Sequence, residues 1–158
     1  MPSRSRHGPF WWRRHDPRTY RSGLEDAIAD QLRAAGIDAA YEQIKIEYVQ
    51  PAKIRKYTPD WILPNGIIIE TKGRFTSEDR QKHLLIQEQH PDLDIRFVFS
   101  NPNTKINKRS QTTYALWCEK HGFLYAAKWI PEEWFNEPPK EIPGLDLENG
   151  IIYVSSGK

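Results

Sequence analysis

Two acidic residues and a lysine flank a turn signal in the middle of the chain. Asp60 is separated by nine residues from Glu70, and Lys72 follows two positions later. The turn signal Pro64-Asn65-Gly66 lies between them, so the flanking segments are expected to pair as a hairpin. Because side chains alternate along a strand, Glu70 and Lys72 would point to one face, with Asp60 across from them on the neighbouring strand.

Two carboxylates and an ammonium group in one place suit metal-assisted hydrolysis of a phosphodiester. Mg²⁺ prefers oxygen ligands, which Asp60 and Glu70 would supply, and the backbone carbonyl of Thr71 is expected to add another. Mn²⁺ is expected to substitute for Mg²⁺. A bound ion would polarise the phosphate and lower the pKa of an attacking water. Lys72 would orient that water or stabilise charge in the transition state.

The pKa of Lys72 is subject to two opposing effects. Burial of the ammonium group would lower the pKa, and neighbouring carboxylates would raise it. The sequence leaves open which effect is larger.

The same residues have a simpler interpretation as surface ion pairs, which contribute at most ~1 kcal/mol each. The acidic and basic pattern alone is loose and by itself favours that interpretation. Two features favour a functional site instead. Glu70 follows the apolar run Ile67-Ile68-Ile69, where an unpaired carboxylate is costly. In addition, Thr58-Pro59 and Gly73 fit a strand that ends in an exposed active-site turn.

Glu25 is a further candidate with two interpretations. It lies three residues after Ser22, the expected N-cap of the first helix, so the spacing alone favours a capping box. The alternative is a third metal carboxylate that a helix delivers to the site.

Periodicity and turn signals predict an α/β fold in which helices flank a mixed β-sheet. Apolar spacing and capping signals indicate helices at residues 22–35, 77–89, 112–121 and 132–135. Alternating or continuous apolar runs indicate strands at residues 44–48, 57–63, 67–72, 95–100 and 123–126. Residues 101–110 are predicted to form a polar, basic loop, and the segment after Pro143 a loosely ordered tail.

Composition and length indicate one globular domain. A chain of 158 residues can bury a substantial core, and 28% charged residues is an ordinary value. No apolar run approaches the ~20 residues of a membrane span, and the N-terminus lacks the apolar segment of a secretory signal. The single cysteine, Cys118, excludes an internal disulfide and a cysteine-based zinc site, so a cytoplasmic location is expected.

Basic residues gather in three clusters although the net charge is only +2. Residues 1–20 are predicted to form a flexible arm rich in arginine and tryptophan, whose rings suit stacking on bases or on the domain. Any one cluster alone is most simply a solvated face, but three around a candidate metal site favour a nucleic acid partner. The residues expected to contact DNA are Arg13, Arg14, Lys53, Arg55, Lys56, Lys105, Lys108 and Arg109.

Eight short segments between about residues 21 and 143 share their sequence and spacing with one known family. They are Arg21-Ser22-Gly23-Leu24-Glu25-Asp26, Tyr57-Thr58-Pro59-Asp60, Leu63-Pro64-Asn65-Gly66-Ile67, Glu70-Thr71-Lys72-Gly73, Lys82-His83-Leu84-Leu85-Ile86, Glu88-Gln89-His90-Pro91, Cys118-Glu119-Lys120-His121-Gly122 and Ile130-Pro131-Glu132-Glu133-Trp134. Together they resemble the phage endonuclease I family, the Holliday-junction resolvases of T-odd bacteriophages.

The resemblance implies a restriction-endonuclease-like core in a homodimer that exchanges segments. The first helix and strand of one subunit would complete the site of the other, with the chains crossing at about residues 49–55. Glu25 would then be a catalytic and metal-binding carboxylate supplied in trans. By the same resemblance, Asp60, Glu70 and Lys72 match the family's metal-binding and catalytic positions. Residues 21–143 would form the nuclease domain, between the arm of residues 1–20 and a tail of residues 144–158.

One position departs from the family pattern. The family has an acidic residue before the Tyr-Glu pair, where this chain has Ala40 before Tyr41-Glu42. The contribution of that acid is therefore either absent or supplied by Glu42.

The expected function is metal-dependent cleavage of branched DNA, with four-way junctions as substrate, by a homodimer that needs no membrane and no small-molecule cofactor. Two fixed active sites in one dimer suit paired incisions at a branch point. Two alternatives stay open from the residues alone: a metal-dependent nuclease acting on linear duplex DNA, and a junction-binding protein that does not cut. A complete set of Asp60, Glu70 and Lys72 favours an enzyme over a binding module.

Overall fold

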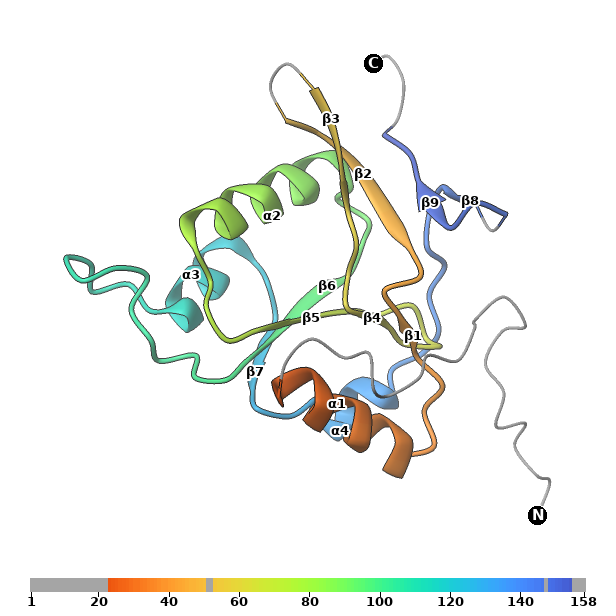
Figure 1. Cartoon of the computed structure of the whole chain (residues 1–158), viewed down its shortest axis with the longest axis horizontal. Coiled ribbons are helices and arrows are strands. Elements are labelled where there is room, and N and C mark those ends of the chain that lie inside the picture. The colour runs from red at the N-terminus through yellow and green to blue at the C-terminus, as the bar shows by residue number, and fades with distance from the viewer. Residues whose placement is uncertain (1–22, 51–52, 147, 155–158) are drawn as a thin grey trace.

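The computed structural model describes residues 23–50, 53–146 and 148–154, and Figure 1 shows their arrangement. The expected basic arm, with Arg13 and Arg14, and the expected N-cap Ser22 lie outside these residues. The described chain forms two mixed sheets with helices against them, which confirms the predicted α/β class.

The most apolar segments of the sequence form the centre of a five-stranded sheet. β5 (Ile68–Lys72) and β6 (Ile95–Phe99) pair in parallel, and every residue of β6 is buried, as expected for a strand covered on both faces. The strand order is β1–β4–β5–β6–β7. β1 (Ala40–Tyr41) and β4 (Trp61–Ile62) run antiparallel to their neighbours, and β7 (Tyr125–Ala127) runs parallel to β6.

Helices cover both faces of this sheet (Figure 1). α2 (Ser77–Gln89) and α3 (Tyr114–His121) pack on one face, and α1 (Gly23–Ala34) and α4 (Glu132–Phe135) pack on the other. Each face has its own apolar cluster, because successive side chains of a strand point to opposite sides. Burial of such side chains stabilises the fold by about 1.5–3 kcal/mol each.

The two clusters divide the buried side chains of β5 and β6 between them. Ile68 and Phe97 join the α2 and α3 side, together with the single, fully buried cysteine, Cys118. Ile69 and Val98 join the α1 and α4 side.

The predicted turn between β4 and β5 is confirmed. The N–H of Leu63 donates to the carbonyl of Ile67, and the N–H of Gly66 donates to the carbonyl of Leu63. Gly66 has a φ of 92°, and a Cβ there would lie 2.6 Å from the carbonyl oxygen of Lys140. The position therefore requires glycine for both its backbone conformation and its space.

A second sheet has the order β3–β2–β9–β8. β2 (Lys45–Gln50) and β3 (Lys53–Tyr57) form a long antiparallel hairpin, and β9 (Ile151–Ile152) pairs in parallel with β2. β8 (Leu145–Asp146) completes the sheet, so the expectation of a loosely ordered tail after Pro143 is wrong for these residues. The segment expected to cross between subunits is the end of this hairpin, and the exchange stays a prediction.

The single strand predicted at residues 57–63 is wrong. Tyr57 ends β3 in one sheet, and Trp61 begins β4 in the other, so the chain changes sheets at Thr58-Pro59-Asp60. Pro59 has no N–H to donate to a strand ladder, which favours a break at this point. Among the described residues, no helix has the length and apolar character needed to cross a membrane.

Candidate active site

Asp60 lies just before β4, and both its backbone and its side chain are hydrogen-bonded to β5. Its N–H donates to Oε2 of Glu70 at 3.4 Å. Its own Oδ2 accepts from the N–H of Thr71 at 2.9 Å and from Oγ1 of Thr71 at 2.7 Å. The antiparallel register, with Trp61 opposite Ile69, brings these groups together. Asp60 is therefore buried and fixed in orientation.

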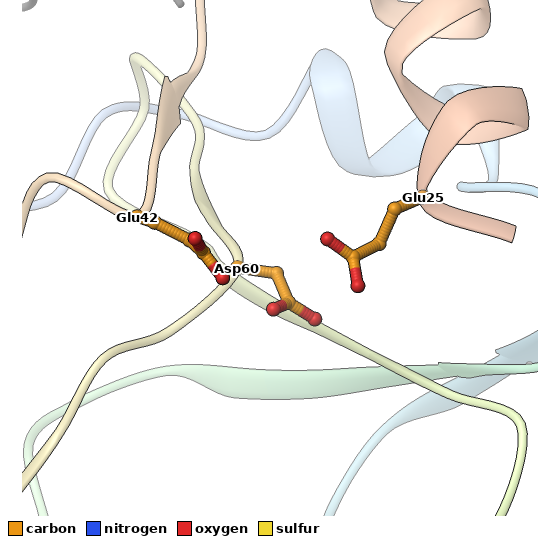
Figure 2. A group of neighbouring side chains, drawn as sticks. All are labelled: Glu25, Glu42 and Asp60. Atoms are coloured by element: carbon orange, nitrogen blue, oxygen red, sulfur yellow. The ribbon is translucent and has the colours of Figure 1, made fainter. Parts of the chain in front are cut away.

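Asp60 lies in a group of three carboxylates from three different segments. One oxygen from each of Glu25, Glu42 and Asp60 lies within 4.8 Å of the others. Glu25 comes from the first turn of α1, and Figure 2 shows Asp60 between it and Glu42. The hydroxyl of Tyr41, on β1, donates to Oε2 of Glu25. Clustered carboxylate oxygens are the ligands that hard divalent cations such as Mg²⁺ prefer.

Glu42 reaches this group through an uncommon backbone conformation. Its φ is 50°, in the left-handed region that residues other than glycine seldom adopt. The N–H of Glu42 donates to the carbonyl of Asp60 at 3.0 Å, which fixes it next to the site. Backbone strain of this kind is concentrated at functional sites.

Burial makes the negative charge of these carboxylates costly. It raises the pKa of Asp60 to about 8, and the charges of Glu70 and Glu25 add to the effect, although hydrogen bonds from Thr71 oppose it. Burial also raises the pKa of Glu70, against the opposing effects of Lys72 and Tyr57. A divalent cation would remove this cost, so the residues present fit a metal site.

The ammonium group of Lys72 lies between two acids. Its Nζ is 3.5 Å from Oε1 of Glu70 and 3.2 Å from Oδ1 of Asp79, which is on α2. Burial opposes the charge of Lys72, but Glu70 and Asp79 outweigh it, so the pKa of Lys72 is raised. The neighbouring carboxylates therefore favour the ammonium form of Lys72.

A pocket of about 480 Å³ opens beside these groups. It is lined by residues from β3, β5, α2 and the segments near them, namely Glu42, Lys56, Tyr57, Thr58, Glu70, Lys72 and Lys82. The buried hydroxyl of Tyr57 donates to Oε2 of Glu70 at 2.5 Å. Glu42 belongs to both the pocket and the group of three carboxylates, so the two adjoin.

The geometry agrees with the sequence prediction in part. Glu70 and Lys72 do line one pocket, and Asp60 lies across from Glu70. The Asp60 carboxylate, however, is bonded to Thr71 and is grouped with Glu25 and Glu42. Thr71 contacts Asp60 through its N–H and hydroxyl, and a metal-binding role for its carbonyl stays a prediction.

The residues expected to bind DNA lie on two surfaces. Lys53, Arg55 and Lys56 are exposed on β3, and Lys56 reaches the pocket. Lys105, Lys108 and Arg109 are exposed on the loop before α3. Their contacts with DNA stay predictions.

Sequence reasoning missed several residues that the fold brings to the site. Tyr41 and Tyr57 were given no role in the site, and each donates to a site carboxylate. Asp79 and Lys82 lie on a helix whose facing direction the sequence did not reveal. The capping-box spacing of Thr76 and Asp79 marks the start of α2, but it does not indicate that Asp79 reaches Lys72.

Comparison with known proteins identifies the family. The model of the family described as phage endonuclease I matches residues 10–152. The chain belongs to the phage endonuclease I family. Endonuclease I of Escherichia phage T7 is 57% identical over 124 residues, which cover 78% of this chain and 83% of that protein. Endodeoxyribonuclease 1 of Enterobacteria phage T3 is 56% identical over 126 residues, covering 80% and 83% respectively.

The match confirms the resemblance drawn from short segments and extends it at both ends. The family's residues include part of the N-terminal arm and also β8 and β9, which lie outside the range of 21–143 inferred from the motifs. Membership in the phage endonuclease I family supports nuclease activity for this chain, and the roles of Asp60, Glu70 and Lys72 in it stay predictions.

Proposed function

We propose that this protein is a metal-dependent endonuclease that cleaves phosphodiester bonds of branched DNA, with four-way junctions as its substrate. The observation that carries the proposal is the set of carboxylates beside the Lys72 pocket. The names of the two relatives, an endonuclease and an endodeoxyribonuclease, support DNA as the substrate.

Asp60, Glu25 and Glu42 would hold a divalent ion, Mg²⁺ or Mn²⁺, with Glu70 next to them. A bound ion supplies Lewis acidity for the phosphate and a lowered pKa for the attacking water. Thr71 keeps the carboxylate of Asp60 turned toward the other acids, and Tyr57 fixes that of Glu70. Lys72 would stabilise the developing negative charge on the phosphate, because the neighbouring carboxylates favour its ammonium form.

We also propose that the active form is a homodimer with exchanged segments. In the single chain described here Glu25 lies next to Asp60 of the same chain, and in the exchanged dimer Glu25 of the partner subunit would take that place. Two features support this. The end of the β2–β3 hairpin has Val49 paired with Ile54, and both side chains are exposed, which suits contact with a partner. Two sites fixed by one dimer also suit paired incisions across a branch point.

The decisive experiment compares a four-way junction with a linear duplex of the same sequence. Each is incubated with the protein and Mg²⁺, Mn²⁺ or EDTA. We expect incision near the branch point with either metal and none in EDTA. Cleavage in EDTA would contradict the metal mechanism. Equal cleavage of both substrates would support a duplex nuclease, and binding without cleavage would support a junction-binding protein.

The variant Glu70→Gln tests the site directly. It removes a carboxylate charge while preserving shape, so we expect the cleavage rate to fall by about 100-fold or more, equivalent to ~2.7 kcal/mol. Junction affinity in EDTA should be largely unchanged. Glu78→Gln is the matched control, because Glu78 is exposed on α2, and it should cleave at the parental rate. A fully active Glu70→Gln variant would exclude the proposed site.

A further inference from the structure

Three lysines from three different elements reach the pocket beside the carboxylates. Lys56 comes from β3, Lys72 from β5 and Lys82 from α2. Lys72 is accounted for by its contacts with Glu70 and Asp79, and Lys56 is an exposed residue of a basic strand. Lys82 has no role yet, although it is more enclosed than an ordinary surface lysine, with 26% of its side chain exposed.

The positive charge of Lys82 is only weakly neutralised by its nearest carboxylate, that of Asp79. Its Nζ lies 3.9 Å from Oδ1 of Asp79, the same oxygen that Lys72 approaches to 3.2 Å. The other carboxylate oxygen of Asp79 accepts from the N–H of Thr76 at the start of α2. The carboxylate of Asp79 thus interacts with both Lys72 and Lys82 and also caps the start of α2.

Packing fixes the direction of the Lys82 side chain. Its Nζ lies 5.1 Å from the centre of the Tyr57 ring, and the hydroxyl of that ring holds Glu70. An ammonium group over an aromatic face is attracted to it, so the ring directs Lys82 into the pocket. Burial and the nearby charge of Lys72 lower the pKa of Lys82, although the carboxylates of Glu70, Asp79 and Asp60 oppose them.

We infer that Lys82 binds a phosphate of the DNA backbone in the pocket that Lys72 and Glu70 also line. Lys82 would then be a second ammonium group in contact with DNA, next to Lys72. The inference rests on the proposed function and extends it with a substrate-binding residue on α2. A lysine suits this task as a compact charge on a flexible stem. A purely structural ion pair with Asp79 is the alternative, and it predicts an effect on stability instead of DNA affinity.

The test measures junction affinity in EDTA as a function of salt concentration for the full-length protein. Lys82→Met removes the charge and keeps the length of the side chain. We expect its dissociation constant to rise by about tenfold near 0.1 M salt, and the log–log salt slope to become shallower by about one. Lys82→Arg should recover most of the affinity and the slope. Lys120→Met, at an exposed site on α3, is the control and should match the parent protein.

The outcomes separate this inference from the proposed function. A parent protein that cleaves junctions, with Lys82→Met equal to it in affinity and salt slope, would overturn the inference alone. Loss of thermal stability in Lys82→Met with unchanged affinity would do the same and would support the structural ion pair. A parent protein that binds junctions but never cuts them would overturn the proposed function, while the shallower slope of Lys82→Met would still support the Lys82 contact.

Discussion

Three of the site carboxylates each have a particular donor that sets their direction. Thr71 donates to Asp60, Tyr41 to Glu25 and Tyr57 to Glu70. Neutral hydroxyl and amide donors orient a carboxylate without cancelling its charge, which leaves the charge available to a cation. The arrangement therefore suits a bound cation. Without a cation, the buried negative charges lower the stability of the folded protein.

This cost leads to a pH prediction for the metal-free protein. The pKa of Asp60 rises from its ordinary value of 3.8 to about 8 in the folded state. The folded protein therefore binds more protons than the unfolded chain between these values, and the stability from protonated Asp60 is present at low pH and lost as pH rises through 8. We expect the melting temperature in EDTA to fall between pH 5 and pH 9.

Asp60→Asn supplies the comparison. It mimics the protonated form, so its melting temperature should fall less over the same pH range than that of the parent protein. Saturating Mg²⁺ should stabilise the parent most at high pH, because binding to the native state adds stability and requires the ionised carboxylate. Parallel pH profiles for the parent and Asp60→Asn in EDTA would show that Asp60 does not carry this effect.

At the residue scale, the sequence was sufficient for the groups that share one strand or one turn. Glu70 and Lys72 follow from the alternation of a strand, and Asp60 follows from the hairpin. The roles of Asp79 and Lys82 depend on how α2 lies against β5, which is decided by packing of distant apolar residues. No local pattern contains that information.

At the scale of elements, the segment after α4 is fastened to β6 by a buried arginine. The guanidinium of Arg96 donates to both oxygens of Asp94 at 2.8 Å and to both oxygens of Glu137, at 2.5 and 2.7 Å. It also lies 5.0 Å from the centre of the Trp134 ring. Acceptors on both sides of one planar group fix the returning chain against the start of β6, near the β4–β5 turn, where Asn65 also donates to the carbonyl of Glu137.

Removing this arginine is expected to destabilise the fold. Arg96→Met leaves Glu137 without its cation and Asp94 with Lys140 alone, and because these carboxylates are partly solvated we expect a loss of about 2 kcal/mol in the free energy of unfolding. Arg33→Met is the matched control, since Arg33 pairs with Asp30 at an exposed site and should lose less than ~1 kcal/mol. Denaturant unfolding measures both. Equal losses would indicate that the network contributes no more than a surface pair.

The elements that sequence patterns predicted are those with strong local signals. α2 has a capping box, α3 ends at Gly122 in the left-handed conformation, and β5 and β6 are apolar runs. β1, β8 and β9 have two residues each, too few for any periodicity. β1 and β9 are strands because partners distant in sequence, β4 and β2, pair with them, and β8 in turn pairs with β9.

At the scale of the whole molecule, the proposed exchange of segments can be tested with mixed subunits. The native mass should be about twice the 18.6 kDa of one chain by light scattering. Glu25→Ala and Asp60→Ala should each be inactive alone. If the two residues of a site come from different subunits, refolding the variants together should restore about a quarter of the active sites, because half of the dimers are mixed and each has one intact site.

A plasmid-nicking or junction-cleavage assay of the mixture measures this recovery. Two copies of Glu25→Ala refolded together are the control and should stay inactive. A mixture of the two variants that never recovers activity after verified subunit exchange would place Glu25 and Asp60 of each site in the same chain.

Because the single cysteine is buried, its reactivity reports on local unfolding of the core around it. Cys118 has no exposed surface, and burial raises its pKa to about 12, so a thiol-specific reagent meets neither an accessible sulfur nor a thiolate while the core is closed. Modification requires α3 to separate from the sheet. The rate of labelling with an aromatic disulfide therefore measures how often that helix separates from the sheet, and slower labelling in the presence of DNA would show that bound DNA stabilises the packing of α3.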